Sequence, residues 1–301
     1  MAEPFHSIDV SEWNRAHSET LGTKPKRWLR EPETDVLWLM KDVTHNTNKD
    51  GSRYQKGDDW AERIAAAVAE SLELPSAQVE LAYDRGTGDG VISRSIIGPS
   101  ETLVLGNELL AGAGFGGTNP RDRAGYTIAT VREVLSKVEP PDAAAGLTAW
   151  ENFVGFLVLD ALVGNSDRHQ ENWAVIAVGG LRRLAPSFDH ASCLGFLLSD
   201  QRRSERLVTR DENQTPERFA DSARTKFENR DSPVATAIAA LEGLPAHARN
   251  HWLARCDDVD AIVRSVALVP ENRISEPARE FAERVLRRNQ SRIVSHPFAT
   301  V

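Results

Sequence analysis

Gly164-Asn165-Ser166-Asp167-Arg168-His169-Gln170-Glu171-Asn172 is the stretch that says most about the fold and chemistry of this chain. Asn172 follows Asp167 by five positions, and Asp189 comes seventeen positions after Asn172. That layout suits phosphoryl transfer, which asks a protein mainly for positioning and charge neutralisation. We expect Asp167 to orient a nucleophile, and Asn172 and Asp189 to hold Mg²⁺ against the phosphates of ATP. The simpler interpretation is that these residues only form turns, because Asp and Asn are common there. For Asp189 taken by itself, this simpler interpretation would be favoured.

The composition is that of an ordinary globular protein. The 301 residues include 41% hydrophobic and 27% charged side chains, and this length suits two lobes that share a cleft. The net charge of −8 argues against a general binder of nucleic acid or anionic membranes, although a local basic groove is compatible with it. Two cysteines fit a reducing cytosol, and the sequence shows neither a signal peptide nor an apolar run of about 20 residues. We therefore expect a cytoplasmic protein with no membrane partner and no direct nucleic-acid partner.

The first hundred residues predict a small sheet with one helix. Residues 1–20 are polar and are expected to form a loosely packed lead-in. A four-residue apolar repeat predicts a helix that is capped by Asp58 and Asp59 and ends at Pro75. The polar stretch 44–57 is expected to be an exposed loop. The stretch 21–29 is expected to be a basic turn that opens into a strand. The other predicted strands are one at 36–41 and a pair at 79–83 and 90–97 joined by a turn at 84–89.

After residue 105 the pattern changes to helices. The glycine-rich stretch 111–119 is expected to be a flexible connection. The predicted elements are helices at 127–138 and 147–163, a hairpin at 173–178 and 181–184, and a final helix from Ser275-Glu276-Pro277 to Arg292. Gly164 suits the stop of the second helix. The Asp167 and Asp189 segments flank the predicted hairpin, which would bring them near each other.

Lys41 closes a strand of bulky apolar residues. A lysine at such a place is costly to bury unless it is paired or faces an anion. Glu62 on the following helix could pair with it and hold the ammonium toward phosphates, and Glu70 is the competing partner. The simpler interpretation is an exposed lysine at a strand end and a glutamate on a solvated helix face. We expect a Lys41–Glu62 ion pair in an active conformation.

A basic segment and two histidines are the remaining candidates. Gly22-Thr23-Lys24-Pro25-Lys26 could cover phosphates with backbone N–H groups and positive charge, although it is neither a G-x-G-x-x-G nor a Walker sequence. His169 lies between Asp167 and Asn172 and is a candidate contact to a phosphate or a base. His169 and His190 with the two aspartates could instead bind a transition metal, although no H-E-x-x-H or close His pair supports this.

These segments fall in kinase order, and the sequence resembles the HipA-like serine/threonine kinases, bacterial toxin kinases distantly related to phosphatidylinositol 3- and 4-kinases. The resemblance covers roughly residues 20–295 and rests on Lys41, Glu62, Ser93-Arg94-Ser95, the stretch 167–172, Phe188-Asp189, and the pieces 103–110, 185–195 and 275–288. Asn165-Ser166 stands where ordinary protein kinases have His-Arg, and Asp189-His190-Ala191 replaces Asp-Phe-Gly. Both departures fit the HipA branch better than the eukaryotic one.

The resemblance implies an α+β protein with a bilobal protein-kinase-like fold. After the lead-in at 1–20 it implies a small sheet-plus-helix N-lobe at 21–105 and a larger, mostly helical C-lobe at 106–301. Asp167 would be the catalytic base, and Lys41 would contact the α- and β-phosphates with support from Glu62. The implied ATP-binding residues are Gly22, Thr23, Lys24, Lys41, Glu62, Ser93, Arg94, Ser95, His169, Asn172 and Asp189, of which Asn172 and Asp189 would also bind Mg²⁺.

We therefore expect an ATP- and Mg²⁺-dependent kinase that transfers the γ-phosphoryl group to a Ser or Thr hydroxyl of a protein substrate. A catalytically weak nucleotide-binding regulatory protein and a metal-dependent phosphohydrolase are the alternatives. Longer family members carry an additional N-terminal subdomain, which is expected here to be a separate polypeptide or absent. The resemblance also leaves open whether an antitoxin-like DNA-binding protein pairs with the chain. It implies autophosphorylation of the phosphate-covering loop, expected within residues 18–23.

Overall fold

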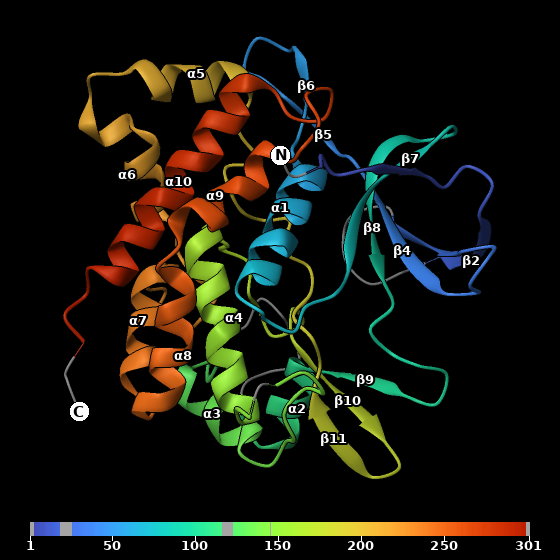
Figure 1. Ribbon diagram of the computed structural model, residues 1–301, viewed down its shortest axis with the longest axis vertical. Helices are drawn as coiled ribbons and strands as arrows, with labels where there is room; N and C mark the ends of the chain where they lie inside the picture. Colours follow the sequence, from blue (N-terminus) through green and yellow to red (C-terminus); the bar gives the residue numbers. More distant parts are fainter. Residues whose placement is uncertain (1–2, 19–25, 116–122, 145, 299–301) are drawn as a thin grey trace.

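The computed structural model of the protein describes residues 3–18, 26–115, 123–144 and 146–298. A sheet-rich N-terminal region lies beside a helical C-terminal region (Figure 1). The large sheet has, in spatial order, β1 (Ser7–Asp9), β7 (Val79–Asp84), β8 (Gly88–Arg94), β4 (Leu37–Asp42), β3 (Lys26–Arg30) and β2 (Asn14–Ser18). β1 pairs parallel with β7, and the other neighbouring pairs are antiparallel. The predicted strands at 36–41, 79–83 and 90–97 are confirmed, although β8 ends at Arg94.

Residues 7–9 and 14–18 belong to the large sheet, so the prediction of a loosely packed lead-in is wrong for them. Ile8 in β1 lies opposite Ala82 in β7, and β2 pairs with β3. Val10, directly after β1, is 1% exposed. β1 has three residues, which is too short for a period-two pattern to be visible in the sequence.

The stretch 44–57, which was expected to be an exposed loop, contains a short hairpin. β5 (His45–Thr47) and β6 (Arg53–Gln55) pair antiparallel. Most of their residues are exposed, as expected, but the backbone is regular. Two three-residue strands of polar side chains bury almost nothing, so no hydrophobic pattern marks them.

α1 (Asp58–Ser71) lies between the large sheet and the helical region, where it contacts β7 and β8 on one side and α4 and α9 on the other. The apolar repeat at Trp60, Ile64, Val68 and Leu72 is buried, which confirms the predicted stripe. Gly57 is the N-cap. Asp58 and Asp59 instead lie inside the first turn and are buried, so the prediction that they cap the helix is wrong. Carboxylates in the first turn also suit the positive end of the helix dipole.

A small sheet joins the two regions. β9 (Thr102–Leu105) pairs with β10 (Ala174–Val178), which pairs with β11 (Leu181–Leu184), and α2 (Gly106–Gly112) follows β9 directly. The predicted hairpin at 173–178 and 181–184 is thereby confirmed. The segment 95–101 carries the chain from the large sheet to the small one.

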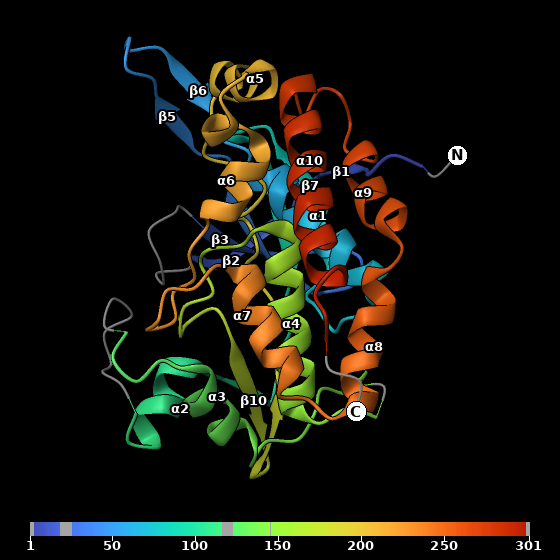
Figure 2. The same ribbon diagram turned by 90° about the vertical axis from the view of Figure 1, so that its left-hand side faces the viewer.

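The helical region is built around α4 (Ala149–Val163), which is buried on all sides. Figures 1 and 2 show α4 in the middle, and α7, α8 and α10 contact it. The other elements of this region are α3 (Ile128–Leu135), α5 (Asp200–Val208), a 3₁₀ turn (Glu212–Gln214), α6 (Pro216–Ser222), α7 (Pro233–Glu242), α8 (Ala246–Cys256), α9 (Val259–Ala267) and α10 (Glu276–Val294). The predicted final helix is confirmed, with Ser275 as its N-cap. Within the described ranges, no helix is both long and apolar enough to cross a membrane.

Candidate active site

Lys41 lies between two carboxylates that come from distant parts of the chain. Its Nζ donates to Glu62 Oε1 at 2.8 Å and Oε2 at 3.1 Å, and to Asp189 Oδ1 at 2.8 Å. Lys41 is 8% exposed and Glu62 is 1% exposed. The predicted Lys41–Glu62 pair is therefore present. The competing Glu70 lies instead near Arg63, with 3.4 Å between the charged atoms.

The charges in this cluster support one another. Burial by itself would lower the pKa of Lys41, but the carboxylates of Asp189 and Glu62 outweigh it and raise that pKa above its usual range. The ammonium is therefore held in its charged form in a buried position. A buried cation between carboxylates is what a site needs to receive phosphate oxygens, because the positive charge is already desolvated and oriented.

The strand geometry decides which face of the sheet this site uses. Side chains alternate along β4, so Leu39 and Lys41 share one face, and Trp38 and Met40 share the other. Ser93 lies directly opposite Leu39 and therefore also lies on the face of Lys41.

Ser95 and Arg94 differ in what they contact. The Ser95 N–H donates to the Leu37 carbonyl at 2.8 Å, where the chain leaves the sheet. Arg94 lies opposite Trp38, on the other face, and its guanidinium is 3.5 Å from Gln78 Oε1. Ser93, Arg94 and Ser95 were all predicted to bind ATP; Ser93 is on the face of Lys41 and the Arg94 side chain is not.

Asp167 lies in the loop that follows α4. Gly164 ends the helix with φ of 67°, a left-handed conformation that favours glycine, as predicted. The Asn172 side-chain amide donates to the Asp167 carbonyl at 2.7 Å, so the loop closes on itself. The Asp167 carboxylate contacts Lys226 Nζ at 3.2 Å through Oδ1 and the Ser192 hydroxyl at 3.3 Å through Oδ2. The structure therefore brings Asp167 and Asn172 together, as the spacing predicted.

Arg168 holds this loop from inside, and the sequence analysis did not single it out. It is 2% exposed and donates to both oxygens of Asp160, at 2.7 and 2.8 Å. It also donates to the Asn172 carbonyl at 2.7 Å and to the Ser187 hydroxyl at 3.1 Å. One buried guanidinium thus joins α4, the Asp167 loop and the Asp189 segment. The available signal was Asp160, an acid in the apolar second half of α4, which calls for a buried partner.

Lys226 and Ser192 were also missed. Lys226 lies in the segment between α6 and α7, and Ser192 lies three residues after Asp189. Ser192 lies within the stretch 185–195 but was not singled out there, and Lys226 stands in no recognisable motif. The contact between Lys226 and Asp167 spans 59 positions of sequence. No local pattern could have predicted it.

Asp189 has an unusual backbone conformation. Its φ is 60°, which places it in the left-handed region that side chains other than glycine rarely adopt. Phe188 packs against the apolar cluster of the small sheet, which anchors the segment. Backbone strain of this kind persists where the surroundings fix it, and it concentrates at functional sites. Here the strained residue is Asp189, whose carboxylate accepts a hydrogen bond from Lys41.

The two histidines lie in different surroundings. His169 Nδ1 accepts from the Glu171 N–H at 3.1 Å, within the Asp167 loop. His190 is buried, with Nε2 2.7 Å from the Ser187 hydroxyl. Burial, and then the charge of Arg168, hold the pKa of His190 well below its usual range, so the ring is neutral.

Two further predictions concern a transition-metal site and the phosphate-covering segment. In the part of the chain that the structure describes, no group of three or more His, Cys, Asp or Glu side chains is placed to hold a metal ion. The alternative of a transition-metal site built on His169 and His190 therefore gains no support. The predicted phosphate-covering residues Gly22, Thr23 and Lys24 lie outside the described residues.

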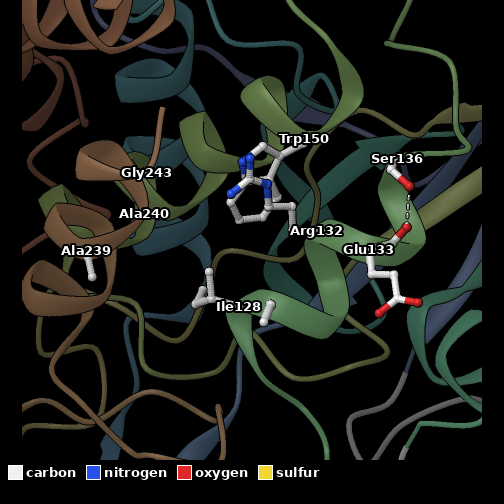
Figure 3. A pocket seen from close by; sticks show the side chains of 9 residues that line it. Ile128, Arg132, Glu133, Ser136, Trp150, Ala239, Ala240 and Gly243 are labelled. Carbon is white, nitrogen blue, oxygen red and sulfur yellow. Dashed lines mark hydrogen bonds between the residues drawn. The ribbon is translucent and has the colours of Figure 1, made fainter. Parts of the chain in front are cut away.

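A separate hollow of about 510 Å³ lies at the other end of α4 from the Asp167 loop (Figure 3). It is lined by α3, by Trp150 at the start of α4 and by Ala239, Ala240 and Gly243 around the end of α7. Arg132 reaches over the Trp150 ring, 6.0 Å from its centroid. None of its lining residues belongs to the Lys41–Asp189 cluster or to the Asp167 loop.

The comparisons with known proteins concern the fold. The sequence matches no protein-family model, and no curated protein sequence matches it. Among solved structures, the chain is similar to the proinflammatory kinase CtkA of Helicobacter pylori, with a TM-score of 0.73 and 19% identity over 96% of each chain. It is also similar to HipA of Shewanella oneidensis MR-1, solved with HipB and operator DNA, with a TM-score of 0.55 and 14% identity. That match covers 94% of this chain and 66% of that HipA chain.

Proposed function

We propose that this chain, which has a HipA-like kinase fold, is an ATP- and Mg²⁺-dependent kinase that phosphorylates Ser or Thr hydroxyls of a protein. The observation that carries the proposal is the Lys41 ammonium, buried and hydrogen-bonded to both Glu62 and Asp189. Phosphoryl transfer needs a cation that faces the phosphates and a carboxylate beside it. The buried Lys41–Glu62 pair, with Asp189 next to it, supplies both.

Some of these residues would bind the nucleotide, and Asp167 would act on the acceptor hydroxyl. Lys41 would release Asp189 and contact the α- and β-phosphates, while Glu62 keeps the ammonium in place. Ser93 and Ser95 would lie beside the adenine, where the chain passes between the two lobes. The Asp167 carboxylate would accept a hydrogen bond from the acceptor hydroxyl and take its proton as the new bond to phosphorus forms.

The donors present fit Mg²⁺. This ion prefers oxygen ligands and is usually held by one or two protein groups together with phosphate oxygens and water. Asn172 and Asp189 supply an amide oxygen and a carboxylate, and Arg168 fixes both of their segments through the Asn172 carbonyl and the Ser187 hydroxyl. When bound there, the ion would neutralise charge on the phosphates.

We further propose that the large sheet with α1 forms the N-lobe, predicted at 21–105 but including also β1 and β2 before residue 21, and that the helical region forms the C-lobe at 106–301. The similar HipA structure contains HipB and operator DNA. An antitoxin-like protein is therefore a proposed partner of this chain, alongside its protein substrate.

Transfer from γ-labelled ATP tests the function against its two alternatives. Purified protein is incubated with a Ser/Thr peptide library and Mg²⁺, with and without EDTA. A kinase labels peptides only without EDTA, a phosphohydrolase releases phosphate alone, and a regulatory nucleotide-binding protein does neither.

Asp189→Ala and Asp142→Ala form a matched pair of variants for the same assay. Asp189→Ala should lower the rate by about 10²-fold or more, because it removes a charge aimed at the phosphates. Asp142 is exposed and lies away from the site, with its carboxylate 3.4 Å from Arg183, so Asp142→Ala should keep the wild-type rate. Near-normal transfer by Asp189→Ala at saturating Mg²⁺ would show that the site is wrongly assigned.

A further inference from the structure

A second cation lies next to the proposed base and comes from a segment that no kinase motif marks. Lys226 Nζ is 3.2 Å from Asp167 Oδ1. Both side chains are about one-third exposed, so the pair lies at the surface of the site, where an acceptor could reach it. Lys41 is engaged by Glu62 and Asp189, so Lys226 is a separate positive charge on the acceptor side.

The backbone around Lys226 is fixed by its neighbours in the sequence. Thr225 and Phe227 are buried, whereas Lys226 between them is half-buried. The Phe227 ring stacks on Tyr126, with 4.4 Å between centroids and 18° between planes. The Glu228 N–H donates to the Tyr126 carbonyl at 2.9 Å. A lysine between two anchored residues keeps its stem in place while its ammonium can shift by a short distance.

Tyr126 also supports the loop of the proposed base. Its hydroxyl donates to the Arg168 carbonyl at 3.1 Å, one residue after Asp167. Burial raises the pKa of Tyr126 above its usual range, so the hydroxyl keeps its proton and remains a donor. One buried ring therefore holds both the segment of Lys226 and the loop of Asp167. The Lys226–Asp167 contact is thus supported from both sides and is more than a chance meeting of two surface side chains.

We propose that Lys226 is a catalytic residue that contacts the transferred phosphoryl group and neutralises its charge during transfer. The proposal rests on the kinase function proposed above. The γ-phosphorus must lie close to the acceptor hydroxyl that Asp167 orients, and Lys226 is within ion-pair distance of that same carboxylate. Cations placed where charge develops in phosphoryl transfer contribute strongly to the rate.

The transfer step gives a reason for the contact between Lys226 and Asp167. The acceptor oxygen forms a bond to the γ-phosphorus, the bond to the bridging oxygen of ADP breaks, and the hydroxyl proton passes to Asp167. As the proton passes, Asp167 loses its negative charge and releases the ammonium. The Lys226 ammonium can then contact the oxygens of the phosphoryl group while the new bond forms. The Ser192 hydroxyl on Oδ2 keeps the carboxylate oriented meanwhile.

The test compares Lys226→Ala with Lys226→Arg and with the control Lys137→Ala. Lys137 is an exposed residue just after α3 and away from the site. Steady-state transfer from γ-labelled ATP to neutral and to acidic Ser/Thr peptides is measured, with circular dichroism to check folding. Lys226→Ala should lower kcat by about 10²-fold for every peptide and leave KM for ATP within about twofold. Lys226→Arg should regain at least about tenfold of this loss, and Lys137→Ala should match wild type.

Four results would overturn the role of Lys226. An active wild type with an equally active, folded Lys226→Ala would show that the contact has no catalytic part. A loss confined to acidic peptides would show that Lys226 recognises the acceptor and does not contact the phosphoryl group. A loss that Arg does not relieve, accompanied by an altered circular dichroism spectrum, would show a structural role. Absence of transfer by wild-type protein would refute the kinase function itself, and the Lys226 role with it.

Discussion

Replacing Asp160 by Asn should strongly destabilise the protein, because it leaves Arg168 as a buried cation without its counter-charge. The pair is 4% and 2% exposed at its side chains, with two contacts of 2.7 and 2.8 Å. Removing one partner of a buried ion pair costs about 3–5 kcal/mol. With about 2.1 cal/mol/K of unfolding entropy per residue, 301 residues give about 0.6 kcal/mol/K. Asp160→Asn should therefore lower Tm by about 5–8 °C, as measured by differential scanning calorimetry.

A matched surface pair provides the control. Glu217 contacts Arg284 at 2.8 Å with both side chains about one-third exposed, and such pairs contribute about 0–1 kcal/mol. Glu217→Gln should therefore shift Tm by less than about 2 °C. The double variant Asp160→Asn with Arg168→Met removes both charges and should be more stable than Asp160→Asn alone. Equal Tm values for Asp160→Asn and Glu217→Gln would refute the argument that Arg168 depends on Asp160.

Three more outcomes are expected. Lys41→Met should lower both the transfer rate and the affinity for ATP, since it removes the cation that would face the phosphates; unchanged kcat and KM would contradict this. Burial raises the pKa of Cys193 well above its usual range and that of Cys256 to about 12, so a thiol reagent at pH 8 should titrate neither in the native protein and both after denaturation. Rapid modification of the native protein would show that these thiols are not protected. Mass spectrometry after long incubation with Mg-ATP should find phosphate within residues 18–23 together with reduced activity, and a fully active protein without phosphate there would exclude this form of regulation.

The sequence by itself determined the elements whose signals are local. α4 was predicted because an apolar helix pattern ends at Gly164, whose freedom at positive φ suits a helix stop. The β10–β11 hairpin was predicted from an apolar run at 173–178 and the segment 181–184 on either side of Gly179-Gly180. The helix stop at Gly164 predicted a tight loop at Asp167, where the Asn172 side-chain amide donates to the Asp167 carbonyl at 2.7 Å. Lys41 at the end of an apolar strand needed a counter-charge, and Glu62 provides one. In each case the physical cause lies within one element or in the cost of burying a single charge.

Only the tertiary structure decided which distant residues complete the site. Arg168 meets Asp160 and Ser187, and Lys226 meets Asp167, through contacts that depend on how α4, the small sheet and the segment before α7 pack. The sheet also took in β1, whose three residues carry no readable pattern until β7 lies beside them. Local periodicity and capping act between near neighbours in sequence, so they can be read directly from the residues. Short strands gain their free energy from burial against remote segments, and a buried charge needs a partner that a remote segment brings to it. Both conditions are met only once the chain has folded.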